Sequence, residues 1–324
     1  MTDTYDTPLD PEQFSFWFAP AGMSLSIGEE QELPLPAIPL PLRSADLPAD
    51  PAVVPAERLI GEGLYDYLCS FPECPHAAAY ADILRQAYPF LIADLGAQLL
   101  VLDLRSSDVS ALRHKMALLK ILLYLEPDNF GLLHKLGVAS LNLALHPTQL
   151  QQIRTQLLDA RQWFEKARRA QADDVSNLDY LGQVCYLCGN YHQAQIYWQS
   201  ALQQAGTEKV SGALAERIDN LTAGTVPLRP LQEALEQVGS ARQHYDRGAF
   251  DQARTLLEEV LHQGDLPRAM PFAEFFYLLG LCREIAEDYP GAYEALMTAT
   301  TLDDKHELAQ QALARVMPEQ REGC

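Results

Sequence analysis

Two stretches of the sequence repeat one pattern of small and apolar residues, and this repeat constrains the fold more than any other feature. In each copy a Leu-Gly pair is followed by an Ala twelve residues after the Gly, and by a second Ala seven residues later. The small residues are Gly182, Ala194 and Ala201 in one copy, and Gly280, Ala292 and Ala299 in the other. A fixed internal pattern indicates a repeat protein, in which each unit buries part of its apolar surface against the next.

The positions of the small residues have a steric explanation. Two antiparallel helices approach closely only where their crossing carries small side chains. We therefore expect Gly182 and Ala194 at one helix crossing, and Gly280 and Ala292 at another.

The pattern resembles the tetratricopeptide repeat, a 34-residue helix-turn-helix unit. Residues 175–208 and 273–306 match it best, and residues 234–267 match with Ala241 in place of the Gly. A fourth copy starts near Phe130 with Leu133, Leu136 and Gly137, but its Ala160, Phe164 and Ala167 arrive eleven residues late. The resemblance covers roughly 60% of the chain and implies an all-α, right-handed helical solenoid.

The late residues of the fourth copy indicate a local irregularity. His146-Pro147 ends a helix that begins near Leu132, and Thr148 with Gln151 forms a capping-box start. The following helix is expected to run to about Gln171, several turns longer than usual, and to project from the solenoid.

Four regions follow from this reading. Residues 1–56 form a Pro-rich, acidic and largely irregular segment with ten of the 21 prolines. Residues 57–127 form an N-terminal helical region, for which a degenerate repeat is one interpretation. Residues 128–304 hold the repeats, and residues 305–324 a C-terminal capping helix and tail.

The N-terminal segment contains an aromatic cluster, Phe14, Phe16, Trp17 and Phe18. Packing on the protein's own surface is the favoured interpretation, because an exposed aromatic cluster is costly, and docking on a partner is the alternative. The stretch from Leu33 to Leu42 alternates Pro with apolar residues and is expected to form polyproline II.

Composition limits the class of partner. The chain has 24 Lys and Arg against 44 Asp and Glu, a formal charge of −20. Nucleic-acid binding depends on neutralising phosphates with basic residues, so DNA and RNA are disfavoured. No apolar run is long enough to span a membrane, so we expect no direct membrane insertion. The acidic N-terminus shows no secretory signal, and the six cysteines suit reduced thiols in the cytoplasm.

No catalytic or metal-binding motif stands out, so we expect no enzyme, no cofactor and no metal. Cys185 and Cys188 lie within the first helix of the best repeat, where a buried thiol acts as a small apolar side chain. Cys69, Cys74 and His76 are too few and too irregularly spaced for a zinc site.

The resemblance places the binding surface on the groove lined by the first helix of each repeat. The groove residues carried over to this chain are His134, Asp179, Gln183, Tyr186, Arg242, Tyr245, Tyr277 and Glu284. Tyrosines and carboxylates suit an extended protein or peptide segment with apolar and basic side chains. The alternative is that several of the tyrosines only pack between repeats.

The function expected from these features is a scaffold or chaperone that binds a partner segment in the groove. One alternative is an acidic chaperone like those of type III secretion, which the stretch from Phe275 to Arg283 resembles. Another is a structural subunit whose groove is filled by its own N-terminal segment. The sequence leaves the oligomeric state open.

Overall fold

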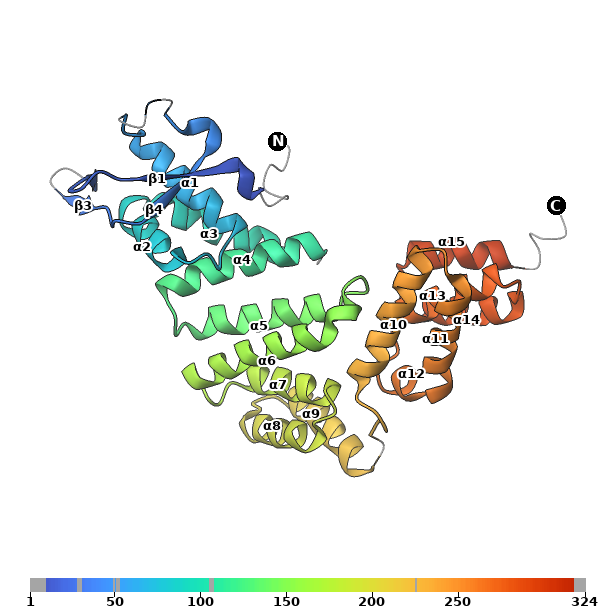
Figure 1. Cartoon of the computed structure of the whole chain (residues 1–324). Helices are drawn as coiled ribbons and strands as arrows, with labels where there is room; N and C mark the ends of the chain where they lie inside the picture. Colours follow the sequence, from blue (N-terminus) through green and yellow to red (C-terminus); the bar gives the residue numbers. More distant parts are fainter. Residues whose placement is uncertain are drawn as a thin grey trace. The chain divides into compact units, whose positions relative to one another are not determined.

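The structure is a computed structural model that describes residues 10–27, 31–48, 50, 53–104, 108–224 and 226–317 (Figure 1). The α-helices are α1 Glu57–Ser70, α2 Ala77–Ala87, α3 Pro89–Leu104, α4 Val109–Leu125, α5 Phe130–Ala144, α6 Ile153–Ala170, α7 Val175–Leu187, α8 Tyr191–Gln204, α9 Glu208–Thr222, α10 Leu231–Asp246, α11 Phe250–Gln263, α12 Asp265–Ala269, α13 Ala273–Ile285, α14 Tyr289–Leu302 and α15 Glu307–Val316. The strands are β1 Phe14–Phe18, β2 Ser24–Ser26, β3 Glu32–Pro34 and β4 Pro39–Arg43, and the 3-10 helices are η1 Pro11–Gln13, η2 Ser44–Asp46 and η3 Leu150–Gln152.

The predicted helical fold class is confirmed, and the helices divide between two compact units. The first unit comprises residues 1–142 and 162–172, and the second comprises residues 143–161 and 173–324, as far as these residues are described. The boundary therefore crosses the α5–α6 hairpin. The predicted capping helix corresponds to α15, whereas the tail beyond Met317, with Cys324, lies outside the described residues.

The N-terminal segment differs from the predicted irregular chain and polyproline II, because it forms two small antiparallel sheets. β1 pairs with β4 and β2 pairs with β3. In the Pro-Leu-Pro-Leu run of β4, Leu40 and Leu42 are fully buried, and Pro41 between them is buried as well. An edge strand tolerates proline, since a missing N–H can face away from the paired strand. Successive side chains of a strand point to opposite faces, so three buried residues in a row show that β4 is covered on both faces.

The sheet of β1 and β4 packs on α1, and together they complete the core of the first unit (Figure 1). A Cβ on Gly63 of α1 would lie 2.9 Å from the Leu42 Cα, so only glycine permits this approach of strand to helix. Tyr80 of α2 donates a hydrogen bond to the Pro39 carbonyl. Helices α1 to α4 lie in the predicted helical region 57–127, and Asp108 caps α4 by accepting from the Ala111 N–H at 2.7 Å.

Three helical hairpins, α7–α8, α10–α11 and α13–α14, form the repeats of the second unit (Figure 1). The predicted crossings are confirmed: Gly182 lies against the Trp198 indole, and a Cβ on Gly280 would come within 2.6 Å of Leu296 Cγ. In both hairpins the small and the large residue are sixteen positions apart. The hairpin turns also match, since Gly189, Gly248 and Glu287 occupy equivalent positions and all have positive φ, of 76°, 77° and 62°.

The α5–α6 hairpin contains the same crossing with a longer connection. A Cβ on Gly137 would lie 2.6 Å from the Phe164 ring, and these residues are 27 positions apart, eleven more than in the other hairpins. The predicted capping box is absent, because Gln149 is the N-cap residue and η3 precedes α6. The expected projection of this helix is wrong as well. Its side chains Ile153, Leu157, Ala160, Phe164 and Ala167 are fully buried.

Candidate partner-binding site

The structure separates the predicted groove residues into three groups. His134 lies on α5 in the first unit, where its ring stacks on Phe130 with centroids 5.6 Å apart and also contacts Phe164. The other predicted groove residues lie in the second unit. His134 is therefore placed by packing within its own helix pair.

The second group lies on α7, where other side chains already engage it. The Asp179 carboxylate accepts hydrogen bonds from Arg217 of α9 and, at 3.0 Å, from Gln183. Tyr186 contacts the rings of Tyr191 and Trp198, with centroids 5.4 and 5.8 Å apart, and burial raises the pKa of its hydroxyl. Because Arg217 holds Asp179 from α9, this part of the predicted groove is partly covered within the chain.

The third group comes together around one pocket of about 320 Å³. Arg242 and Tyr245 reach it from α10, Tyr277 and Leu281 from α13, and Leu308 from α15. The remaining wall is the turn after α5, at His146, Pro147 and Thr148. Helices α10, α13 and α15 and this turn thus form a pocket with both aromatic and aliphatic walls.

Charged side chains at this pocket form ion pairs with one another. The Glu274 carboxylate lies between Arg242 and His306, whose Nε2 is 3.1 Å from Glu274 Oε2. Glu284 on α13 accepts two hydrogen bonds from the Arg315 guanidinium, at 3.0 and 2.9 Å. The acidic groups of the predicted groove are therefore largely neutralised by the protein itself.

The two tyrosines of the pocket pack between repeats and also line open space. Tyr245 contacts Phe250 with ring centroids 5.2 Å apart, and Tyr277 contacts His306 at 4.8 Å. Burial raises the pKa of both hydroxyl groups. Both rings lie against the apolar cluster around Leu281, so their positions are fixed before any partner binds.

Sequence reasoning missed two walls of this pocket, Leu308 and the turn after α5. The signal for the turn was Gly239 of α10. A Cβ there would lie 2.5 Å from the Gln151 N and 2.8 Å from the Leu150 carbonyl carbon, so the η3 backbone rests directly on α10. Gln151 Nε2 also donates to Gln243 Oε1 at 2.7 Å. A glycine at an otherwise regular helical position marks such a close approach.

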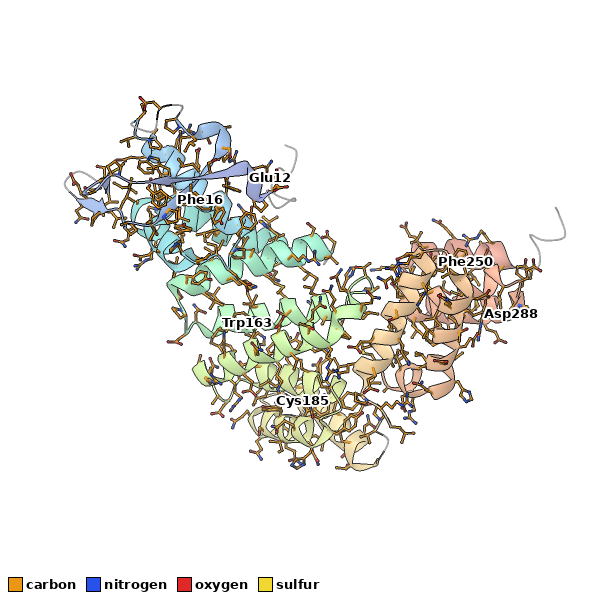
Figure 2. The ribbon with its side chains drawn as sticks, in the orientation of Figure 1. Glu12, Phe16, Trp163, Cys185, Phe250 and Asp288 are labelled. Carbon is orange, nitrogen blue, oxygen red and sulfur yellow. The ribbon has the colours of Figure 1, made fainter. Side chains whose placement is uncertain are left out.

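The N-terminal aromatic cluster packs on the first unit, as the favoured interpretation held. Phe14 and Trp17 are buried, and the Phe14 and Tyr67 ring centroids are 5.1 Å apart. Phe16, labelled in Figure 2, is 47% exposed and Phe18 is 66% exposed. Half of the cluster therefore belongs to the core of that unit.

The two cysteines of the best repeat occupy different places. Cys185, labelled in Figure 2, is fully buried in α7, whereas Cys188 is the C-cap residue just after the helix. Its expected position within the helix is thus wrong by one residue. Burial raises the pKa of the Cys188 thiol. Among the residues that the structure describes, no three His, Cys, Asp or Glu side chains gather to hold a metal ion.

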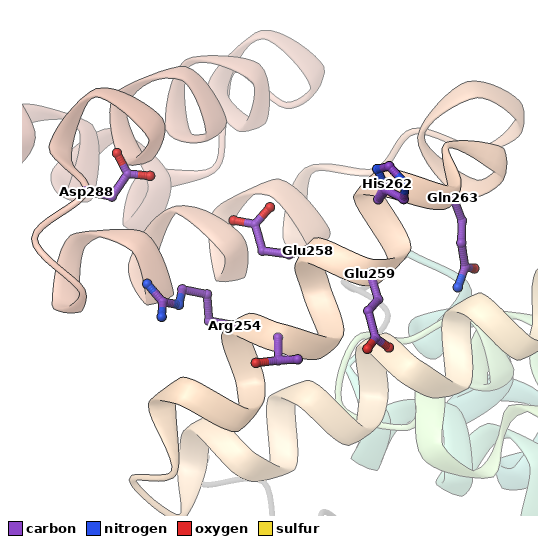
Figure 3. Close-up of a pocket in the computed structure, with 7 residues that line it drawn as sticks. Arg254, Glu258, Glu259, His262, Gln263 and Asp288 are labelled. Atoms are coloured by element: carbon purple, nitrogen blue, oxygen red, sulfur yellow. The ribbon is translucent and has the colours of Figure 1, made fainter.

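A second hollow of the repeats, of about 590 Å³, lies along α11 (Figure 3). Its walls are polar and include Arg254, Glu258, His262 and Asp288. Glu258 is already engaged, because it accepts two hydrogen bonds from Arg283, at 2.7 and 2.9 Å. This hollow lacks the apolar anchors of the pocket on the first helices.

Comparison with known proteins adds little to this description. No protein-family model matches the sequence, and no curated protein is detectably similar to it. A crystal structure of a tetratricopeptide repeat protein from Parabacteroides merdae is similar at 15% sequence identity and a TM-score of 0.27, over 70% of this chain and 98% of that chain. The repeats of this chain are tetratricopeptide-like in their own spacing and packing. None of the described helices is both long and apolar enough to cross a membrane.

Proposed function

We propose that the protein is a binding scaffold that holds an extended segment of a partner protein across α10, α13 and α15. The pocket at Tyr245, Tyr277 and Leu308 carries this proposal, because it joins α10 and α13, the first helices of two successive repeats, to the capping helix α15. Leu308 is 57% exposed and lines this pocket, so it offers apolar surface to a partner. The proposal assigns the protein no enzymatic role and no cofactor.

The pocket favours apolar side chains of the partner over basic ones. Aromatic and aliphatic anchors in a preformed pocket supply much of the affinity of such complexes. The carboxylates of Glu274 and Glu284 already have cationic partners, whereas the Asp246 side chain is 62% exposed and has only a distant contact with Arg242, at 3.8 Å. We therefore expect an apolar segment in which a basic residue meets Asp246.

A chaperone role is a more specific version of this proposal. The two alternatives are a type III secretion-like chaperone and a structural subunit with a filled groove. The stretch that resembles type III secretion chaperones contains Phe275, Leu279 and Cys282, each 1% exposed. Those three residues are packing positions, whereas Tyr277 and Leu281 of the same stretch line the pocket. The other alternative is a structural subunit whose groove is filled by its own N-terminal segment. That segment packs within the first unit, whereas the pocket is lined by residues of the second unit. We also propose a cytoplasmic location, because none of the five described cysteines forms a disulfide, as is usual in a reducing compartment.

Site-specific crosslinking tests the proposal. A photoreactive phenylalanine analogue replaces Leu308 in one protein and Met297 of α14, which is 38% exposed, in a matched control. We expect crosslinks from position 308 to one segment of a partner, identified by mass spectrometry. A synthetic peptide of that segment should then bind the full chain and bind Tyr245→Ala about tenfold or more weakly. Equal crosslinking from both positions, or unchanged binding by Tyr245→Ala, contradicts the proposal.

A further inference from the structure

Positive charge is concentrated in one part of this acidic chain. Residues 109–170 contain nine Lys and Arg but only four Asp and Glu, whereas the whole chain contains 24 and 44. That stretch has a formal charge of +5, and the rest of the sequence carries −25. Within α4 there are three basic residues and no carboxylate. The chain therefore contains a basic region although its overall formal charge is −20.

A groove of the first unit lies in this basic region and has a volume of about 1050 Å³. Leu123, Leu133 and Trp163 form its apolar floor. They come from α4, α5 and α6, and Figure 2 labels Trp163 on α6. Leu133 is buried, and the other two pack partly buried against the core of the unit, so the floor is fixed by the fold.

Basic side chains surround this floor. Lys166 and Arg169 are exposed residues of α6, and Lys120 reaches the groove from α4. The Lys166 Nζ lies 4.1 Å from the centroid of the Trp163 ring, which keeps the ammonium over the floor. A ligand in this groove would meet apolar surface and cationic groups together.

The Lys120 ammonium is already positioned to bind a carboxylate. Its Nζ lies 2.5 Å from Glu73 Oε1, and the Lys120 side chain is 21% exposed whereas that of Glu73 is 73% exposed. An exposed carboxylate contributes little to such a pair, because water screens and solvates it. A carboxylate from a ligand can therefore replace Glu73 on Lys120 at small cost.

We propose that this groove binds a short acidic segment of a partner protein. An apolar side chain of the segment packs on Trp163, and one of its carboxylates takes the place of Glu73 on Lys120. The other carboxylates meet Lys166 and Arg169. This site is separate from the pocket on α10, α13 and α15, so either proposal can fail without the other.

A peptide suits the groove better than a nucleic acid. The lining also includes the carboxylates of Glu73 and Asp128, which would oppose a continuous line of phosphates. A peptide can place single carboxylates on the cations and apolar side chains between them. The floor of leucine and tryptophan then gains contacts that phosphate would not make.

Fluorescence anisotropy on the full chain tests the proposal with labelled probes. The first probe is a peptide of Glu and Asp around Leu and Phe, the second has Lys in place of the acidic residues, and the third is an oligothymidylate. We expect the acidic peptide to bind at least about tenfold more tightly than the other two, with an affinity that falls as salt is raised.

Charge-changing variants test whether the acidic peptide binds in this groove. The double variant Lys166→Glu, Arg169→Glu should weaken the acidic peptide about tenfold, whereas Lys209→Glu, an exposed residue of α9, should leave it unchanged. Glu73→Gln should tighten binding a few-fold, because it removes the intramolecular competitor, and Glu216→Gln on α9 is its matched control. Tighter binding of the basic peptide or the oligothymidylate overturns the proposal, as does an affinity that the double variant does not change.

Discussion

Gly239 offers a direct test of how the long α5–α6 connection is held. In Gly239→Ala the new methyl group would lie 2.5 Å from the Gln151 N and 2.8 Å from the Leu150 carbonyl carbon. Both neighbours are backbone atoms of η3, which cannot rotate away as a flexible side chain could. Either α10 and η3 separate by several tenths of an ångström, or η3 leaves its place.

Two opposing contributions set the change in the free energy of unfolding of Gly239→Ala. Alanine in a helix interior is more favourable than glycine by about 1 kcal/mol, and this gain applies to any helical glycine. Overpacking in a filled site costs roughly 1–3 kcal/mol. Gly239→Ala should therefore lower the free energy of unfolding of the second unit by up to about 2 kcal/mol.

Gly212 supplies the matched control, because it lies inside α9 and a Cβ there meets nothing within 4 Å. Gly212→Ala should raise the stability by up to about 1 kcal/mol. Urea denaturation followed by circular dichroism compares the two variants, and hydrogen exchange follows the amides of residues 146–153. We expect Gly239→Ala to be less stable and to exchange faster in that segment. Equal stabilisation by both variants, with unchanged exchange, would refute the docking of η3 on α10.

Three further predictions concern the repeats and the two ion pairs of Asp103. Ala194→Leu should lower the free energy of unfolding by roughly 1–3 kcal/mol, because Ala194 is fully buried at a helix crossing, and an unchanged midpoint in urea argues against the crossing. Glu287→Gly should raise stability by about 1 kcal/mol, since Glu287 has a φ of 62° where its equivalents are glycines; a loss of stability would contradict this. Burial acts to raise the pKa of Asp103, but hydrogen bonds from Lys115 and Lys135 outweigh it and leave the pKa lowered. The resulting stabilisation is present above the unfolded-state pKa and is lost as pH falls through the lowered value, so Asp103→Asn should flatten the loss of stability below about pH 4.

The repeats could be predicted because their spacing follows from helix geometry. A small residue and the large one that covers it are sixteen positions apart in the hairpins of Gly182 and Gly280. The same rule identified the α5–α6 hairpin from Gly137 and Phe164, although its connection is longer. The resemblance to the tetratricopeptide repeat put Arg242, Tyr245 and Tyr277 on first helices, and all three line one pocket in the structure; their role in binding stays a prediction.

What the sequence did not reveal depends on contacts between distant segments. Leu308 and the turn at His146 reach the pocket only because α15 and η3 pack beside α13 and α10. The hydrogen bond from Arg217 to Asp179 joins α9 to α7 across a connection that no local pattern specifies. The strand β4 was missed because its alternating prolines suggested polyproline II, whereas in the structure it pairs with β1 and packs on α1.

The division of the α5–α6 hairpin between the two units has a consequence during synthesis on the ribosome. The first unit needs residues 162–172 and so cannot be complete when Asn142 emerges. Residues 143–161 belong to the second unit. The hydrogen bond from Gln151 to Gln243 can form only after Gln243, 92 residues later, has been synthesised. Part of the nascent chain therefore stays exposed until most of the protein has been made. A truncated chain ending at Asn142 would lack part of its own first unit, whereas a longer fragment ending at Ala172 would contain all of it.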